Sequence, residues 1–292
     1  MFRCGTVAIV GRPNVGKSTL LNRLVGQKLS ITSDRPQTTR HRIIGVVHRP
    51  DAQLLFLDSP GYQTRIGGTM NRVLNRTSMQ VAQDADVVVL VCDARNWTAT
   101  DTRIAKALPS DRPVLLVMNK VDLVKDKERL LPAIDRVRQV REFDEIVPLS
   151  ARSGRQIEAL VDACAKRLPE GSPLYDADAL TDRSERFLAA ETIREKLFRQ
   201  LGDEVPYAST VEIEQYEELP KLRRIHAAIV VDREAQRPIV IGAHGERIKR
   251  IATDARLDLE RLFGTKVFLE LFVKVKSGWA GSEQSLRSYG YE

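Results

Sequence analysis

The octapeptide Gly11-Arg-Pro-Asn-Val-Gly16-Lys17-Ser18 follows an apolar run, Val7 to Val10, and precedes a stretch of helical periodicity. The pattern G-x-x-x-x-G-K-S between a strand and a helix predicts a phosphate-binding loop. Its glycines let consecutive backbone N–H groups converge on one concavity, and the helix N-terminus adds partial positive charge beside them. The residues expected to bind phosphates are Gly11, Arg12, Pro13, Asn14, Val15, Gly16, Lys17, Ser18 and Thr19, together with Asp58 and Gly61 of a second motif.

A magnesium site is predicted where this loop meets that second motif. Lys17 would reach the β- and γ-phosphates, and the Ser18 hydroxyl would ligate Mg²⁺. The apolar run Leu54 to Leu57 ends in Asp58-Ser-Pro-Gly61. A carboxylate at the carboxyl end of a buried strand beside the phosphate loop holds Mg²⁺, usually through water. The Gly61 N–H would approach the γ-phosphate and release it after hydrolysis, as in a switch loop.

The segment Ile31 to Arg42 is rich in Ser, Thr and Arg and has neither helical nor strand periodicity. A loop of this length is usually functional. Thr38 and Thr39 place hydroxyls where a switch loop could close over Mg²⁺ and the γ-phosphate. The alternative, a solvated loop without a role, stays open on composition alone. We expect switch segments at residues 31–42 and 61–69.

Short apolar runs alternate with helix-like stretches through the first 170 residues, a β-α-β order typical of a doubly wound α/β domain. The runs rich in Val, Ile and Leu lack polar alternation, as strands buried on both faces of a mostly parallel sheet do. The expected strands are Thr6–Val10, Gln53–Leu57, Asp86–Cys92, Pro113–Met118 and Ile146–Leu149, with His41–Arg49 at a sheet edge because its polar residues are frequent.

Two further motifs predict that the bound base is guanine. Asn119-Lys-Val-Asp122 follows the apolar run Val114 to Met118. The Asp122 carboxylate would accept both hydrogen bonds from the guanine N1–H and 2-amino edge, a donor pair that adenine lacks. Asn119 would tether neighbouring loops and Lys120 would cover the ring face. Beyond the next strand, the tripeptide Ser150, Ala151, Arg152 would supply a backbone N–H to guanine O6.

A different organisation begins after the break Pro169-Glu-Gly-Ser-Pro173. Periodicity predicts a helix at Ser184–Leu201, two antiparallel strands, a second amphipathic helix from Ile248 to Leu262, and a final strand at Val267–Val275. The two antiparallel strands are Thr210–Tyr216 and Arg224–Asp232, separated by Pro220, and the apolar run Pro238–Ile241 follows them. We expect a nucleotide-binding domain at 1–170, a linker at 171–183, a smaller α+β domain at 184–280 and a tail at 281–292.

The tetrapeptide Gly242-Ala-His-Gly245 lies between the apolar run and the amphipathic helix. A G-x-x-G loop in this position clamps the backbone of about four nucleotides in KH domains, because glycines allow phosphates to come close. Cations follow at the start of the helix, where they oppose the helix dipole unless an anion binds nearby. The expected RNA-binding residues are Ile241, Gly242, Ala243, His244, Gly245, Arg247, Lys249 and Arg250.

The charge balance of the 292 residues agrees with a polyanionic partner, because 46 Lys and Arg face 39 Asp and Glu. Residues 221–276 hold 13 basic and 7 acidic side chains, whereas residues 173–220 hold 5 and 12. The acidic stretch either keeps the first helix of the smaller domain off RNA or docks it on a basic surface. Three scattered cysteines, Cys4, Cys92 and Cys164, fit neither a disulfide framework nor a metal knuckle.

No apolar run is long enough for a transmembrane helix, and the N-terminus has no signal-peptide pattern, so we expect a cytoplasmic protein. Peripheral association with the inner face of the cell membrane stays open. Zinc chemistry and a nucleophilic serine have no supporting motif.

These motifs, in this order, resemble the Era family of bacterial GTPases. The resemblance rests on the phosphate loop, Gln37-Thr-Thr-Arg-His-Arg42, the stretch Val240 to Arg250, Gly264 to Leu271 and Trp279, and covers nearly the whole chain. It implies a P-loop GTPase domain followed by a type II KH domain. It also implies GTP hydrolysis with Mg²⁺ as cofactor. The implied partner is the 3′ end of 16S ribosomal RNA, bound during maturation of the small (30S) ribosomal subunit. We expect the protein to be a monomer.

By this resemblance Thr39 is the expected switch ligand of Mg²⁺, with Thr38 as the alternative. Tyr62 stands where Ras-type GTPases carry the glutamine that orients water, so we expect slow intrinsic turnover. The expected catalytic groups are Lys17, Thr39, Gly61 and Asn14, the last by holding K⁺ as an activating cation. Equally open is that Asn14 only stabilises the loop. The rival functions are a membrane-associated or cell-cycle regulatory GTPase and a P-loop ATPase.

Overall fold

The computed structural model describes residues 1–33, 35–63, 68–126, 128, 130–202 and 205–291, which divide into two compact units. The first unit comprises Met1–Ser30, Thr39–Asp182 and the C-terminal Tyr291. The second comprises Ile31–Thr38 and Arg183–Gly290. Two features differ from the expected division: the first predicted switch segment groups largely with the second unit, and the expected linker, residues 171–183, groups almost entirely with the first.

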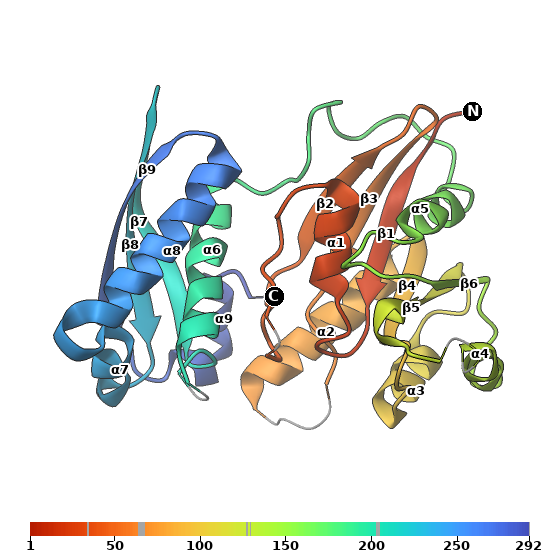
Figure 1. Cartoon of the computed structure of the whole chain (residues 1–292), viewed down its shortest axis with the longest axis horizontal. Coiled ribbons are helices and arrows are strands. Elements are labelled where there is room, and N and C mark those ends of the chain that lie inside the picture. The colour runs from red at the N-terminus through yellow and green to blue at the C-terminus, as the bar shows by residue number, and fades with distance from the viewer. Residues whose placement is uncertain (34, 64–67, 127, 129, 203–204, 292) are drawn as a thin grey trace. The chain divides into compact units, whose positions relative to one another are not determined.

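The first unit is built on a six-stranded sheet in the order β2-β3-β1-β4-β5-β6 (Figure 1). All neighbouring strands are parallel except the edge strand β2, which runs antiparallel to β3. The strands are β1 (Arg3–Val10), β2 (Ile43–His48), β3 (Ala52–Asp58), β4 (Val87–Asp93), β5 (Val114–Asn119) and β6 (Glu145–Pro148). The predicted mostly parallel sheet with this strand at one edge is therefore confirmed, although β2 is mostly apolar and the polar residues His41, Arg42 and Arg49 lie outside it.

Helices cover both faces of this sheet. The buried core on one face joins apolar side chains of β1, β3, β4 and β5 to those of three helices, α2 (Thr69–Asp84), α3 (Ala99–Ala107) and α4 (Leu130–Arg138). The helices α1 (Lys17–Val25) and α5 (Ile157–Ala165) pack against each other and against β3. Because the strands are buried on both faces, β3 and β4 are apolar along nearly their whole length and have no exposed residue.

The register of the sheet brings the predicted motifs to one edge. Ile9 of β1 is paired with Asp58 of β3, and Asp93 of β4 is paired with Asn119 of β5. The phosphate loop, the D-x-x-G motif and the N-K-x-D motif therefore all leave the sheet at the carboxyl ends of parallel strands, where ligands of open α/β sheets bind.

The segment after α5 is held against the first unit by the side chain of Gln53. This side chain is 1% exposed. Its Oε1 accepts the backbone N–H groups of Leu174 (2.7 Å) and Tyr175 (3.0 Å), and its Nε2 donates to the Tyr175 carbonyl (2.7 Å). Further along, the Val46 N–H donates to the Leu180 carbonyl. These hydrogen bonds from the Gln53 side chain and from β2 to the backbone hold residues 174–180 in the first unit.

We expect the substitution Gln53→Ala to lower the free energy of unfolding by about 2–4 kcal/mol, since the three hydrogen bonds that the buried Gln53 side chain makes to residues 174 and 175 would be lost. Urea unfolding of the whole chain measures this change. The control is Gln80→Ala, which removes a glutamine paired with an exposed carboxylate on α2. Equal stability of the two variants would contradict the assigned role of Gln53.

The second unit contains a three-stranded sheet in the order β7-β8-β9, with β7 (Ser209–Leu219) antiparallel and β9 (Lys266–Val275) parallel to β8 (Leu222–Val231). Its core joins the strands to α6 (Glu185–Gln200), α7 (Arg237–Ile241) and α8 (Glu246–Phe263). The strands β7 and β8 are longer than predicted. The apolar run Pro238–Ile241, to which the sequence assigned no element, forms most of helix α7, with Pro238 near its start.

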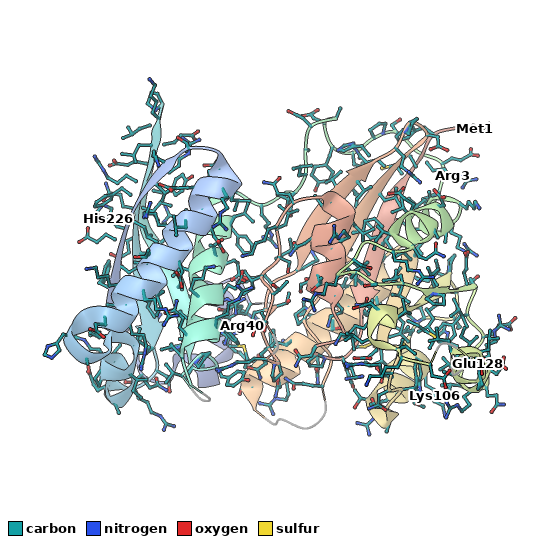
Figure 2. The ribbon with its side chains drawn as sticks, viewed as in Figure 1. Met1, Arg3, Arg40, Lys106, Glu128 and His226 are labelled. Carbon is teal, nitrogen blue, oxygen red and sulfur yellow. The ribbon has the colours of Figure 1, made fainter. Side chains whose placement is uncertain are left out.

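The C-terminal residues are more ordered than the expected tail. They contain α9 (Glu283–Ser288), and the side chains of Trp279, Leu286 and Tyr291 are all at most 1% exposed. Within the first unit Tyr291 stacks near the ring of His41, with 4.7 Å between ring centroids, and faces the guanidinium of Arg40, which Figure 2 labels. None of the helices in the described ranges is long and apolar enough to cross a membrane.

Candidate nucleotide-binding and RNA-binding sites

The phosphate loop joins the end of β1 to the start of α1 through backbone conformations that few residues adopt. Asn14 has φ 64° and Gly16 has φ 98°. A Cβ atom on Gly16 would lie 2.4 Å from Asn119 Nδ2, and one on Gly11 would lie 2.3 Å from the Val91 carbonyl oxygen. A side chain at Gly11 would meet the backbone of β4 and one at Gly16 would meet Asn119, and both glycines have a positive φ, 151° and 98°.

Lys17 is buried at the first position of α1, where its Nζ donates to the Gly11 and Arg12 carbonyls at 3.1 Å each. Burial lowers the pKa of Lys17 to about 8, and the nearby Asp58 carboxylate opposes that shift. An ammonium group that donates to loop carbonyls is ready to exchange them for phosphate oxygens, which bind a cation more strongly.

Three predicted magnesium ligands converge beside Lys17. The Ser18 hydroxyl lies 2.8 Å from the Thr39 hydroxyl and donates to Asp58 Oδ2 at 2.7 Å. Asp58 is fully buried, and burial raises the pKa of its carboxyl group. Its second oxygen, Oδ1, has no hydrogen-bond partner among the described residues. A buried carboxylate with a spare oxygen, beside two hydroxyls, fits a hard divalent cation and its waters.

The two candidate threonines differ in where their hydroxyls point. The Thr39 hydroxyl lies against Ser18, whereas the Thr38 hydroxyl donates to the Arg35 carbonyl at 2.6 Å. Within the second unit, Arg194 of α6 donates to the Thr38 carbonyl at 2.5 Å, and Arg199 lies 3.4 Å from the Thr32 carbonyl. Adjacent residues of the first switch segment therefore have partners in different units.

Ser30 is a residue of this site that sequence reasoning missed. Its buried hydroxyl donates to the same Asp58 oxygen as Ser18, at 2.8 Å. The side-chain amide of Asn22 fixes its backbone, donating to the Ser30 carbonyl and accepting its N–H. No motif surrounds Ser30, so only the folded chain reveals its contact with the carboxylate.

Replacing Ser30 with Ala is expected to weaken Mg²⁺ binding in the nucleotide complex about 10-fold, since partners that orient a metal-binding carboxylate commonly contribute about 10- to 100-fold. The measurement is the Mg²⁺ concentration that half-suppresses release of a fluorescent GDP analogue. The control is Ser33→Ala, whose hydroxyl accepts a local N–H from Arg35. Identical Mg²⁺ dependence in both variants would contradict the prediction.

Gly61 approaches the phosphate loop so closely that no side chain fits. A Cβ atom there would lie 2.9 Å from backbone atoms of Pro13. The N–H of Tyr62 donates to the Gly11 carbonyl at 3.1 Å, and its ring packs against the core. The structure thus shows the Tyr62 ring against the hydrophobic core of the first unit and its backbone on the phosphate loop. Part of the second predicted switch, residues 64–67, lies outside the described residues.

The guanine motif is organised around Asn119, which is 2% exposed. Its Nδ2 donates to the Val15 carbonyl at 2.8 Å, and its Oδ1 accepts the N–H groups of Lys120 (2.8 Å) and Ala151 (3.0 Å). The phosphate loop and the Ser150–Arg152 loop are thus tied together before any base is present. Asp122 is exposed in a short 3-10 turn after β5.

Lys120 takes a left-handed backbone conformation, φ 66°, that turns its side chain back over the phosphate loop. Its Nζ donates to the Asn14 carbonyl at 2.6 Å and forms an ion pair with Asp93 at 3.1 Å. Asp93 is buried, yet hydrogen bonds from Arg95 and Lys120 hold the pKa of its carboxyl group well below its usual range. Lys120 thus links the phosphate loop to the end of β4.

In the second unit, the G-x-x-G loop connects α7 to α8. Gly242 has φ 76° and Gly245 has φ 78°, and His244 between them has φ 49°. A Cβ atom on Gly242 would lie 2.7 Å from the Cβ of Arg247, whereas no described atom lies within 4 Å of one on Gly245. Ala243 and His244 are exposed at the tip.

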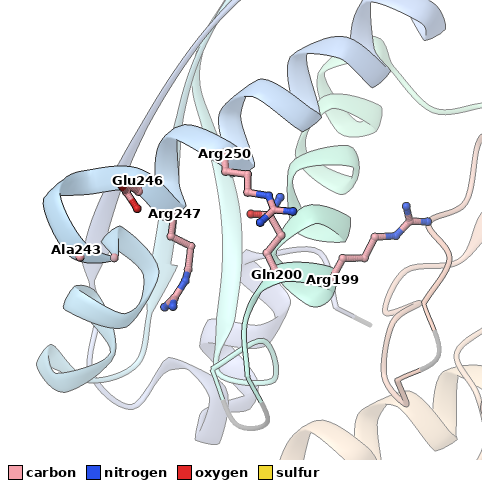
Figure 3. Close-up of a pocket in the computed structure, with 7 residues that line it drawn as sticks. Arg199, Gln200, Ala243, Glu246, Arg247 and Arg250 are labelled. Carbon is pink, nitrogen blue, oxygen red and sulfur yellow. The ribbon is translucent and has the colours of Figure 1, made fainter.

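A pocket of about 450 Å³ lies beside this loop (Figure 3). Its lining residues are Arg199, Gln200, Gly242, Ala243, Glu246, Arg247 and Arg250. Arg247 also donates to the Ile239 carbonyl, and Lys249 and Arg250 are exposed. The structure thus gathers several predicted RNA-binding residues and adds the end of α6, which sequence reasoning missed because it is about 40 residues away along the chain.

Two family models match the chain: a 50S ribosome-binding GTPase at residues 6–120 and a KH domain at residues 204–280. The GTPase Era of Bordetella pertussis is 50% identical over 291 residues, which span 100% of this chain and 98% of that protein. The chain belongs to the Era family of GTPases.

Other members of the Era family agree in sequence and in structure. The GTPase Era of Chromobacterium violaceum is also 50% identical over 291 residues. A crystal structure of Era with MgGDPNP and nucleotides 1506–1542 of 16S ribosomal RNA has a TM-score of 0.95 and 40% identity, covering 100% of this chain and 99% of the other. An Aquifex aeolicus Era variant bound to GDP·AlF4⁻ has a TM-score of 0.94, 39% identity and 99% coverage of each chain.

Membership in the Era family confirms the predicted fold class, a P-loop GTPase domain followed by a KH domain. It also makes this chain a GTPase. The family models, however, assign no role to single residues.

Proposed function

We propose that this chain is a GTP-hydrolysing switch that binds the 3′ end of 16S ribosomal RNA through its KH unit and assists maturation of the small ribosomal subunit. The observation that carries the proposal is that one chain holds both the guanine-nucleotide motifs and a G-x-x-G loop with positive φ at both glycines. A similar Era, solved with MgGDPNP and a 16S fragment, supports both ligands.

In the proposed site Ser18, Thr39 and Asp58 would hold Mg²⁺. When bound, Mg²⁺ neutralises charge that develops on the β- and γ-phosphates. The Lys17 ammonium group would exchange its hydrogen bonds to the loop carbonyls for hydrogen bonds to phosphate oxygens. The N–H of Gly61 would bind the γ-phosphate and release it after hydrolysis, which would change the conformation of the second switch segment. The location of the Thr39 hydroxyl beside Ser18 supports Thr39 over Thr38.

The switch is proposed to act through residues 31–42. The Thr39 hydroxyl lies at the proposed metal site, while the adjacent Thr38 carbonyl accepts a hydrogen bond from Arg194 of α6. Arg194 is itself buried and paired with Glu191 at 2.7 Å. If GTP orders Thr39, the backbone of the adjacent Thr38, which Arg194 of α6 binds, would change its conformation. The last residues of α6, Arg199 and Gln200, line the pocket beside the G-x-x-G loop.

Hydrolysis is proposed to depend on K⁺ held with the help of Asn14, because Tyr62 cannot orient water as an amide does. We expect the GTPase rate to fall about 10-fold or more when Na⁺ replaces K⁺, and the variant Asn14→Ala to be slow in both salts. Phosphate release assays in matched chloride salts measure the rates. Equal wild-type rates in K⁺ and Na⁺ would leave Asn14 as a residue that only stabilises the loop.

Crosslinking in cells, followed by sequencing of bound RNA, tests the proposed function. With GTP-state and GDP-state variants, we expect crosslinks at the 3′ end of 16S RNA whose yield depends on the nucleotide. A pulldown should recover small subunits only while Gly242 and Gly245 are intact. Recovery that is independent of these glycines would favour the rival, a regulatory GTPase at the membrane or in the cell cycle. The proposed active form is a cytoplasmic monomer.

A further inference from the structure

The Arg12 side chain of the phosphate loop points toward helix α3. Its Nε lies 3.0 Å and 3.2 Å from the two carboxylate oxygens of Asp101, and its Nη2 donates to the Asn96 carbonyl at 3.1 Å. Asp101 is 0% exposed and the Arg12 side chain is 22% exposed. A buried carboxylate that pairs with a guanidinium forms a strong, directional contact.

The Asp101 carboxylate is fixed by the start of α3 independently of Arg12. Asp101 is the third residue of α3 and forms a capping box with Thr98. Its Oδ2 accepts the Thr98 N–H at 2.8 Å and the Thr98 hydroxyl at 2.7 Å. Because a capping box restrains both of its side chains, the carboxylate is held in place for Arg12.

The backbone carbonyls of Arg12 and of the preceding Gly11 accept several of the hydrogen bonds that stabilise the phosphate loop. The Arg12 carbonyl accepts a hydrogen bond from Lys17 Nζ, and the Gly11 carbonyl accepts from both Lys17 Nζ and the Tyr62 N–H. Any rotation of the Arg12 backbone would disturb these contacts and redirect the neighbouring N–H groups. A side chain tied to α3 opposes that rotation.

We propose that Asp101 is a positioning residue for nucleotide binding, which acts through Arg12 to fix the phosphate-loop backbone. The proposal rests on the proposed nucleotide site and assigns Arg12 a different part from direct phosphate binding. The guanidinium stays on Asp101 while the loop N–H groups and Lys17 bind the phosphates. Through Asp101 and Asn96, Arg12 joins the phosphate loop to α3 and to the segment that precedes this helix.

A double-mutant cycle tests this proposal on the full-length chain. The variants are Asp101→Asn, Arg12→Gln and the two combined, and the readout is the Kd for Mg²⁺·GDP. The amide that Asp101→Asn introduces retains an acceptor for the Thr98 N–H, so α3 keeps much of its cap. We expect each single variant to raise Kd about 10-fold, as loss of a charged hydrogen bond does. The double variant should be no weaker than either single one, because both remove the same contact.

Thr98→Val is the matched control, because it removes the hydroxyl of the capping box but keeps the backbone N–H that donates to Asp101, so the carboxylate stays in place for Arg12. We expect this variant to lower thermal stability and leave the Kd for GDP unchanged. The ³¹P resonance of the β-phosphate of bound GDP should shift in Asp101→Asn and Arg12→Gln but not in Thr98→Val. A purely structural role of Asp101 would leave this resonance unmoved.

Three outcomes would overturn the proposal. Additive losses of about 100-fold in the double variant, or a loss in Arg12→Gln with normal binding by Asp101→Asn, would make Arg12 a direct phosphate ligand. Equal behaviour of Asp101→Asn and Thr98→Val would make Asp101 a helix cap only. Failure of the unmodified chain to bind GDP is distinguishable from all three, since it would refute the proposed nucleotide site itself.

Discussion

Replacing Asp122 with Asn is expected to lower the affinity for GTP by about 100-fold or more and to produce a preference for xanthosine triphosphate. In the proposed site the carboxylate accepts the N1–H and 2-amino hydrogen bonds of guanine. An amide presents a donor in place of one acceptor, which matches the 2-oxo group of xanthine instead. Sites that hydrogen-bond a polar group discriminate by large factors, because the wrong partner leaves polar groups unpaired.

Competition of GTP, xanthosine triphosphate and ATP against a fluorescent GDP analogue measures this change for the wild type and Asp122→Asn. The control is Asp126→Asn, an exposed aspartate further along the same loop region, which should bind GTP as the wild type does. Tight ATP binding by the wild type, or an unchanged preference in Asp122→Asn, would contradict the assignment of guanine to this loop.

The second large effect is expected in the G-x-x-G loop. Replacing both Gly242 and Gly245 with Asp should weaken binding of an RNA oligonucleotide with the 16S 3′-end sequence by about 100-fold or more. Each Asp would force a side chain into a positive-φ position and add negative charge beside the RNA phosphates. The GTPase rate without RNA should be retained, because the loop belongs to the second unit.

Single alanine substitutions separate the two causes. Gly242→Ala should be worse than Gly245→Ala, since only the first places a Cβ within 2.7 Å of Arg247, while φ is 76° and 78° at the two positions. Gly264→Ala, also at positive φ and with no described atom within 4 Å, is the control for strain alone in the same unit. Fluorescence anisotropy gives each Kd for RNA. Equal losses in Gly242→Ala, Gly245→Ala and Gly264→Ala would show that general destabilisation, rather than the loop, causes the effect.

Much of the nucleotide site could be predicted because its motifs are contiguous and encode local backbone geometry. The phosphate loop, Asp58 to Gly61 and Asn119 to Asp122 each follow a strand that apolar composition alone reveals. Parallel strands carry their carboxyl ends to one edge, so motif order predicts which loops meet. The edge position of β2 was predicted correctly, but the polar residues that suggested it, His41, Arg42 and Arg49, flank a strand that is itself mostly apolar.

Sequence could not predict contacts whose partners are distant in the chain and lie in no motif. Ser30 meets Asp58, Gln53 holds residues 174–175, and Asp101 holds Arg12, each through a single side chain. In the sequence, each of these side chains looks the same as an exposed polar residue with no partner, so the contact cannot be predicted. Tyr291 is buried for the same reason, although its position near the chain end suggested a tail.

The sequence by itself determined the fold class, the nucleotide motifs and the KH loop, because spacing and apolar periodicity fix local structure. For the pair Thr38 and Thr39, sequence offered a preference only through family resemblance, and tertiary structure shows that the Thr39 hydroxyl lies beside Ser18. Tertiary structure alone shows where the Arg12 guanidinium points. Neighbouring residues of the same type have nearly the same local preferences. Their difference arises only when packing gives one of them a buried carboxylate or hydroxyl as partner and turns the other away.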